Sequence, residues 1–176
     1  KKIIAVEKDK IMIEILKETL SGCKNIKVIN GDILKIENWD FIENCKLKIE
    51  NYKVVANIPY YLTSPLIRKF LEERNPPEEM ILMLQKEVAQ RICSKPPDMS
   101  LLAVSVQFYA KAKIISYVPK NCFWPAPKVD SAIVKIMPCL PAGRHKKNKP
   151  STESFFKIVK AGFSQDFGWG GVFISG

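Results

Sequence analysis

The sequence predicts an α/β fold, in which a mostly parallel sheet alternates with helices and gains an antiparallel strand at its edge. Strand and helix patterns alternate along most of the chain, and two consecutive strands close the series. The strand at residues 52–57 is rich in valine and alanine on both faces, as is typical of a parallel sheet. The chain has 176 residues, 47% of them hydrophobic, which is enough for one domain with a sizeable core.

The first part of the chain predicts a strand, a helix and a second strand. The opening KKIIAVEKD is the first strand. Isoleucine and leucine recur at mostly helical spacing over Lys10–Leu20, and Ser21-Gly22 ends this helix. A short strand at Ile26–Ile29 then leads into a turn at Asn30-Gly31-Asp32.

The same alternation continues through the middle of the chain. After the strand at Tyr52–Asn57 we expect a helix over residues 63–73, capped by Thr63 or Ser64. The remaining elements are a strand at Met80–Leu84, helices at Lys86–Cys93 and Ser100–Ala110, and strands at Lys113–Val118 and Val129–Met137. The last two strands flank a proline-rich loop, which predicts an antiparallel pair.

The character of the sequence changes after Pro138. Residues 139–150 contain the run GRHKKNKP, which predicts a basic, exposed linker. A helix is expected at Thr152–Ala161. We therefore predict an α/β domain at residues 1–138, a linker at 139–150 and a helical segment beginning at 151–176.

The overall composition favours a polyanionic partner. The formal net charge is +10, from 28 Lys and Arg against 18 Asp and Glu, an excess typical of nucleic-acid-binding proteins. A generally basic, lysine-rich proteome would explain the charge equally well. The five cysteines are scattered without CxxC spacing, so we expect reduced thiols of a cytoplasmic protein with no metal site or disulfide frame. No apolar stretch approaches the length of a membrane span.

Acidic residues follow two predicted strands, at the edge where an open parallel sheet binds ligands. A carboxylate at Glu7 could accept hydrogen bonds from both ribose hydroxyls of a nucleoside. At the next strand end, Asp32 could accept from an adenine amine while the Ile33 amide faces the ring. Each has a structural alternative, a helix N-terminal acid for Glu7 and a plain turn for Asp32. With Asn57 at the third strand end, the set favours a nucleoside site.

The stretch Asn57-Ile58-Pro59-Tyr60 ends an apolar strand with groups that suit an adenine base. An adenine amine is a poor nucleophile, because its lone pair is delocalised into the ring. The Asn57 side-chain oxygen and the Ile58 carbonyl can accept both amine hydrogens and turn the lone pair toward a methyl sulfonium. Pro59 fixes the backbone, and Tyr60 offers a stacking face for a flipped-out base. The alternative is a strand-to-helix turn with ordinary buried aromatic residues.

Three segments in order carry a specific resemblance. They are NIPYYLTSPLIRKF, MLQKEVAQRI and FWPAPKVDSAIVKI. The first resembles the NxPY motif of adenine-specific, S-adenosylmethionine-dependent methyltransferases. Together they resemble the ribosomal small-subunit RNA adenine dimethyltransferase family (the KsgA type) over about residues 3–164.

The resemblance implies a Rossmann-like methyltransferase domain at residues 1–138, with the start of a small C-terminal helical domain at 151–176. It implies that Glu7 holds the ribose and Asp32 the adenine amine of the cofactor S-adenosylmethionine. Asn57 would then lie between cofactor and target amine, and Phe123 would stack on the target base opposite Tyr60.

The resemblance also implies the substrate and partners. The family places two methyl groups on each of two adjacent adenosines in a hairpin of small-subunit rRNA, so we expect a monomer that acts on the immature subunit. From charge alone, eight basic residues are candidates for phosphate contacts. They are Arg68, Lys69, Lys86, Arg91, Lys128, Arg144, Lys146 and Lys147.

Two departures from the family pattern leave alternatives open. No glycine occurs before Gly22, so we expect the family's glycine-rich cofactor loop and its strand to precede residue 1. The ending DFGWGGVFISG does not continue the family's helical domain. The alternatives are a non-catalytic RNA-binding, assembly or transcription factor, a large-subunit rRNA methyltransferase of the macrolide-resistance type, and a nucleotide-binding oxidoreductase. The NIPY strand end does not suit the last.

Overall fold

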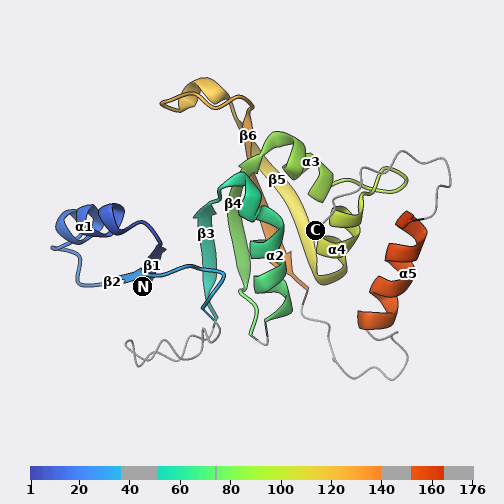
Figure 1. The fold of residues 1–176 in the computed structure, drawn as a ribbon, viewed down its shortest axis with the longest axis horizontal. Helices are drawn as coiled ribbons and strands as arrows, with labels where there is room; N and C mark the ends of the chain where they lie inside the picture. The colour runs from blue at the N-terminus through green and yellow to red at the C-terminus, as the bar shows by residue number, and fades with distance from the viewer. Residues whose placement is uncertain (37–50, 74, 140–151, 165–176) are drawn as a thin grey trace. The chain divides into compact units, whose positions relative to one another are not determined.

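The computed structural model describes residues 1–36, 51–73, 75–139 and 152–164, apart from the side chains of Tyr60, Thr152 and Ser164 (Figure 1). The chain forms two compact units, Lys1–Glu50 and Asn51–Gly176. Each unit is described by itself below. The predicted linker residues Arg144, Lys146 and Lys147 lie outside the described residues.

The first unit is a parallel β–α–β arrangement. Strand β1 (Ile3–Glu7) pairs with β2 (Ile26–Asn30), and α1 (Lys10–Thr19) connects them. Asp9 caps α1, because its Oδ1 accepts a hydrogen bond from the Ile11 amide at 2.8 Å. The register pairs Glu7 with Asn30, so both strands end at the same edge, as the sequence predicted.

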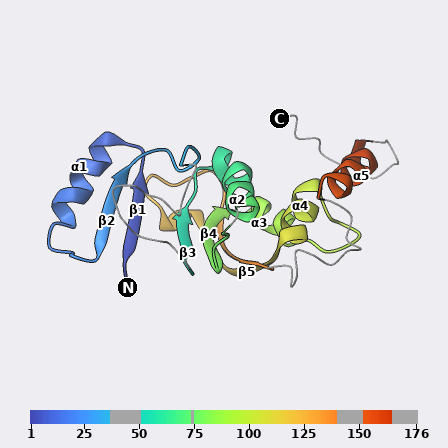
Figure 2. The ribbon, with the colours of Figure 1, turned by 90° about the horizontal axis from the view of Figure 1, so that it is seen from below.

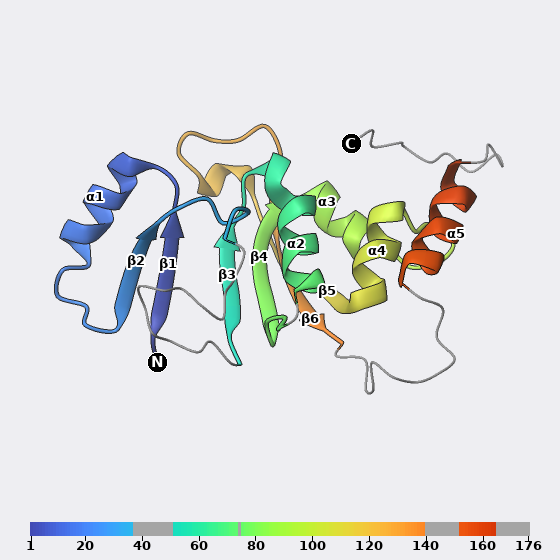
Figure 3. The ribbon, with the colours of Figure 1, turned by 60° about the horizontal axis from the view of Figure 1, so that its bottom comes forward.

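The second unit is a four-stranded sheet in the order β3-β4-β6-β5. Its strands are β3 (Lys53–Asn57), β4 (Glu79–Gln85), β5 (Ala110–Val118) and β6 (Ser131–Pro138). Strands β3 and β4 are parallel, whereas β6 runs antiparallel to both β4 and β5 (Figure 3). The sheet is therefore mixed, as expected.

The antiparallel strand lies one place in from the expected edge. Strand β6 is the antiparallel member, and β5 occupies the edge beside it. The side chains explain this order. Ala132, Val134 and Ile136 of β6 are fully buried, which suits an inner strand. The edge strand β5 instead exposes Lys111 and Lys113, and exposed lysines are typical of edge strands.

Helices α2 (Thr63–Glu72), α3 (Lys86–Ile92) and α4 (Leu101–Tyr109) lie on one side of this sheet (Figure 2). The core forms where alternate strand residues meet the apolar side of these helices. Met80 and Leu82 of β4 have no exposed surface, and Phe70 of α2 is 2% exposed. Burial of such side chains stabilises the fold by about 1.5–3 kcal/mol each.

The start of α2 differs from the prediction. The expected cap by Thr63 or Ser64 is wrong, because the helix begins at Thr63 itself and the preceding Leu62 gives no side-chain cap. A short 3₁₀ turn, η2 (Tyr60–Leu62), runs directly into the helix, and the Leu62 amide donates to the Pro59 carbonyl at 2.9 Å.

Helix α5 (Thr152–Ser164) packs its aromatic side chains on the end of α4. The rings of Phe155 and Phe108 stack at 4.2 Å between centroids, and Phe156 lies 5.4 Å from Phe108. The helix ends three residues beyond the predicted Ala161, at Ser164. Among the described residues, no helix combines the length and the apolar character that crossing a bilayer requires.

An ion-pair network links three strands of the second sheet. Glu79 of β4 accepts from Lys53 of β3 at 2.7 Å through Oε1 and pairs with Lys135 of β6 through Oε2. Hydrogen bonds from Lys135 and Lys53 lower the pKa of the Glu79 carboxyl to about 2. The network therefore favours the folded state while Glu79 is ionised.

Replacing Glu79 with Gln should lower the thermal unfolding temperature at neutral pH, since both lysines lose a charged partner. The pKa of about 2 lies below its ordinary 4.5, so this stabilisation is fully present above pH 4.5 and is lost as the pH falls toward 2. The difference in melting temperature between the parent and Glu79→Gln should thus shrink below about pH 4.5. The neighbouring, exposed Glu78→Gln is the matched control, and an equally large effect there would contradict the assignment.

Candidate functional site

A pocket opens at the carboxyl end of β3, within the second unit. The Ile58 amide donates to the Met83 carbonyl of β4 at 3.3 Å, and the Ile58 side chain is only 4% exposed. The register of β3 with β4 ends at Asn57 and Met83, and after Pro59 the chain turns into η2. Asn57 is exposed, and its side chain makes no hydrogen bond to any described residue. The carboxamide is therefore available to a ligand.

The opposite wall is the proline-rich loop between β5 and β6. A short 3₁₀ turn, η3 (Lys120–Cys122), starts the loop, and half-buried Phe123 follows it. Asp130 joins the start of the loop to the start of α3. Its Oδ1 accepts from the Lys120 amide at 3.1 Å, and its carbonyl accepts from the Lys86 amide at 3.0 Å. The Lys86 ammonium also lies 3.7 Å from Asp130 Oδ2. These contacts fix the loop beside the start of α3.

The pocket has a volume of about 520 Å³, enough for a purine ring. Four of the five predicted catalytic residues, Asn57, Ile58, Pro59 and Phe123, line it. The side chain of the fifth, Tyr60, lies outside the described residues. The other lining residues are Tyr61, Met83, Leu84, Trp124, Pro125, Pro127 and Ser131.

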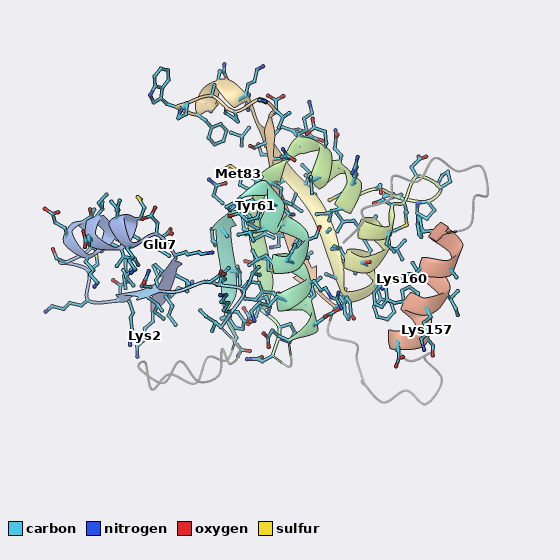
Figure 4. All side chains as sticks on the ribbon, viewed as in Figure 1. Lys2, Glu7, Tyr61, Met83, Lys157 and Lys160 are labelled. Carbon is cyan, nitrogen blue, oxygen red and sulfur yellow. The ribbon has the colours of Figure 1, made fainter. Side chains whose placement is uncertain are left out.

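Several of these lining residues were not predicted from the sequence. Met83 is the register partner of Asn57, and its side chain lies with that of Tyr61 over the ends of β3 and β4 (Figure 4). The parallel pairing of the two strands was the signal that could have placed Met83 in the pocket. Tyr61 and Trp124 stand directly beside predicted residues, so adjacency could have suggested them.

The two predicted cofactor carboxylates lie at the matching ends of β1 and β2 in the first unit. Glu7 Oε1 accepts from the Lys8 amide at 2.7 Å and from the Asp9 amide at 2.8 Å. Asp32 Oδ1 accepts from the Leu34 amide at 3.0 Å, and its Oδ2 accepts from the Lys8 ammonium at 3.0 Å. Both carboxylates are thus oriented by their own turns.

The hydrogen bond from the Leu34 amide, and then that from Lys8, lower the pKa of the Asp32 carboxyl below its ordinary value. Asp32 is therefore a hydrogen-bond acceptor at neutral pH. Ile33, predicted to face a cofactor ring, follows it and is half-buried. In the described part of the chain, no group of three or more His, Cys, Asp and Glu side chains is arranged to hold a metal ion.

The five described candidates for phosphate contacts differ in their surroundings. Arg68 and Lys69 of α2 pair with Glu72 and Glu73 at 3.0 and 3.4 Å. Lys86 pairs with Asp130 and lies 5.7 Å from the centroid of the Tyr117 ring. The two others, Arg91 and Lys128, are exposed and make no ion pair with a described residue.

Comparison with known proteins gives a consistent result. The model of the family described as ribosomal RNA adenine dimethylase matches residues 1–166. Ribosomal RNA small subunit methyltransferase A of Dehalococcoides mccartyi is 43% identical over 162 residues, which cover 92% of this chain and 53% of that protein. The protein of the same name from Clostridioides difficile is 39% identical over 171 residues, covering 93% and 56%. The chain thus spans about half the length of the curated relatives it matches.

Solved structures agree. A dimethyladenosine transferase from Plasmodium falciparum superimposes with a TM-score of 0.65 at 32% identity, covering 78% of this chain and 48% of that one. The 23S rRNA methyltransferase ErmE gives a TM-score of 0.67 at 29% identity, covering 79% and 53%. The predicted Rossmann-like methyltransferase fold is confirmed by these two matches.

The role of Asp130 in fixing the pocket wall can be tested by hydrogen exchange. In Asp130→Ala, the amides of the non-proline residues between 120 and 128 should exchange roughly two- to tenfold faster, the effect of losing one hydrogen bond. Asp130→Asn keeps an acceptor for the Lys120 amide and should change exchange less. Asp98→Ala, in another exposed loop, is the control. Unchanged exchange in Asp130→Ala would show that the loop is held by other contacts.

Proposed function

Because this chain belongs to the ribosomal RNA adenine dimethylase family, as its three motifs predicted, we propose that it methylates adenosine in ribosomal RNA. The proposed reaction transfers methyl groups from S-adenosylmethionine to the exocyclic amines of two adjacent adenosines in a small-subunit rRNA hairpin. The product is dimethyladenosine, made during ribosome biogenesis. The names of the curated relatives support the small subunit over the large one. The single observation that carries the proposal is that Asn57 and Phe123 line the same pocket.

The pocket supplies the polar groups that an adenine amine requires. The free Asn57 carboxamide and the Ile58 carbonyl can accept the two amine hydrogens, which turns the nitrogen lone pair out of the ring plane. Phe123 and the aromatic residues that follow Pro59 can hold the base by stacking. The polar contacts strengthen as the amine becomes tetrahedral, so they stabilise the transition state more than the bound substrate.

The reaction needs no general base before methyl transfer, because the amine can lose its proton afterwards. S-adenosylmethionine, when bound, supplies an electrophilic methyl group on a sulfonium. Transfer of this methyl group would form a nitrogen–carbon bond in place of the sulfur–carbon bond and would leave the positive charge on the amine, beside the Asn57 side-chain oxygen and the Ile58 carbonyl. The amine then loses a proton, which Asn57 or the Ile58 carbonyl can direct toward water. The second methylation, of the monomethyl amine, follows the same steps.

We assign cofactor binding to Glu7, Asp32, Ile33 and Asn57. The two carboxylates fit a nucleoside, because backbone amides orient them at the ends of neighbouring parallel strands. Glu7 keeps Oε2 for ribose hydroxyls, since both of its amide contacts use Oε1. Asp32 suits the adenine amine, and the Ile33 amide suits the ring.

The proposed domain organisation follows the family. Residues 1–138 would form the catalytic domain, residues 139–150 a basic linker and residues 151–176 the beginning of a helical domain. The proposed partner is the immature small subunit, bound by a monomer through rRNA phosphates. Of the five described candidates, Arg91 and Lys128 are best suited to phosphate, because no described carboxylate pairs with them. Arg68, Lys69, Lys86, Arg144, Lys146 and Lys147 complete the proposed set.

Asn57→Ala tests the proposed function directly. In the gene product that contains this chain, the variant should lower kcat for methyl transfer to an rRNA hairpin by about a hundredfold or more, because a transition-state contact is lost. RNA affinity should stay within about twofold, since phosphate contacts dominate it. Mass spectrometry of nucleosides from the treated RNA gives the rate. Asn75→Ala, outside the pocket, is a control. Dimethylation by Asn57→Ala at the parental rate would refute the assigned role.

Glu7→Ala tests the cofactor assignment. Loss of a charged hydrogen-bond partner costs about 1.5–3 kcal/mol, so S-adenosylmethionine should bind roughly ten- to a hundredfold more weakly. Titration calorimetry on the same gene product measures this affinity. Glu14→Ala is the matched control, because Glu14 is an exposed carboxylate of the same unit on α1. Equal affinities for the parent and Glu7→Ala would remove Glu7 from the site.

A further inference from the structure

Two large aromatic side chains at the pocket face solvent. Trp124 is 98% exposed and Tyr61 is 78% exposed, although both line the pocket. Large aromatic side chains are normally largely buried, so a solvated tryptophan is an informative exception. Its exposure also means that Trp124 contributes little to the core of this unit.

The backbone explains how Trp124 reaches this position. Phe123 is extended, with φ −117° and ψ 150°, and successive side chains of an extended chain point to opposite sides. Phe123 is accordingly half-buried at the pocket, whereas Trp124 projects outward from the same wall. The Asp130 contacts fix the loop that presents both rings.

The surroundings of Trp124 favour RNA over an apolar partner. Lys120 and Lys128 of the same loop are exposed, and neither side chain pairs with a described carboxylate. A cationic loop with a projecting aromatic ring is the arrangement by which proteins hold single-stranded nucleic acid, through phosphates and stacked bases.

We propose that Trp124 is a positioning residue that stacks on the base next to the adenosine held in the pocket. This inference rests on the proposed function and adds a contact to a second nucleotide. Flipping the target adenosine removes one stacking partner from its neighbour. The indole ring replaces that partner, so it stabilises the flipped arrangement in the substrate complex and in the transition state alike.

The test uses methylation kinetics with variants of Trp124 and three hairpins. One hairpin is intact, and the others carry an abasic nucleotide on the 5′ or the 3′ side of the target adenosine. On the intact hairpin, Trp124→Ala and Trp124→Leu should raise KM about five- to a hundredfold with kcat unchanged. Trp124→Phe keeps a stacking face and should recover most of the parental KM. Trp124→Leu separates stacking from apolar size.

The abasic hairpins test whether Trp124 acts by stacking on a neighbouring base. On one of the two, the parent and Trp124→Ala should have the same KM, because the stacking partner is absent. A parental KM for Trp124→Ala on the intact hairpin, or the same KM ratio on all three hairpins, would overturn the proposal. If the parent methylates no hairpin, the proposed function fails instead. Dissociation constants of the same proteins and RNAs then decide, since the coupling must appear in RNA binding or the proposal is wrong.

Discussion

The pocket depends on where the parallel pairing of β3 and β4 stops. Asn57 is in register with Met83, and the next amide, of Ile58, still donates to the Met83 carbonyl. The ring of Pro59 fixes its φ angle, and the chain turns there into η2, where the Leu62 amide donates to the Pro59 carbonyl. The buried Ile58 side chain fixes the departing chain to the core. The end of the β3–β4 pairing thus accounts for three features of the site. They are the exposed Asn57 carboxamide, the Ile58 carbonyl beside it and the turn that leads into α2.

The opposite wall of the pocket, the loop that carries Phe123, depends on the antiparallel pairing of β4 with β6. Strand β4 pairs antiparallel with β6 up to Gln85 and Ser131, where β6 begins. Asp130 precedes that point and joins the start of the loop to the start of α3. Parallel and antiparallel neighbours of β4 therefore bring two segments more than 60 residues apart in the sequence, around Asn57 and Phe123, to one pocket. An antiparallel strand at the sheet's outer edge could not do this.

The sequence predicted elements well where apolar spacing determines them, as in α1 and β4, and the NxPY stretch indicated one wall of the pocket. The position of β6 inside the sheet was not predicted. Strand order depends on which strand can stand at the solvent-exposed edge. Comparing the lysines of β5 with the apolar residues of β6 would have been needed to place β5 there. The exposure of Trp124 was also missed, since a tryptophan among prolines carries no periodic signal. The ion pair between Lys86 and Asp130 joins residues far apart in the sequence, so spacing does not indicate it. The pairs of Arg68 and Lys69 have i, i+4 spacing on a predicted helix, so the sequence does indicate them.

If the chain binds RNA as proposed, its ion pairs limit how the net charge of +10 can act. Arg68 pairs with Glu72 while its side chain is 76% exposed, and such pairs are weak enough for a phosphate to displace the carboxylate. The Lys69 side chain is only 15% exposed, so its pair with Glu73 is harder to replace. Each phosphate contact contributes about −0.7 to −0.9 to the slope of log affinity against log salt. The slope should therefore count the exposed cations that are weakly paired or that pair with no described carboxylate. Lys128 is of the second kind and lies on the loop that carries Trp124. Charge and stacking would then act from the same loop, the first holding the strand and the second ordering its bases around the pocket.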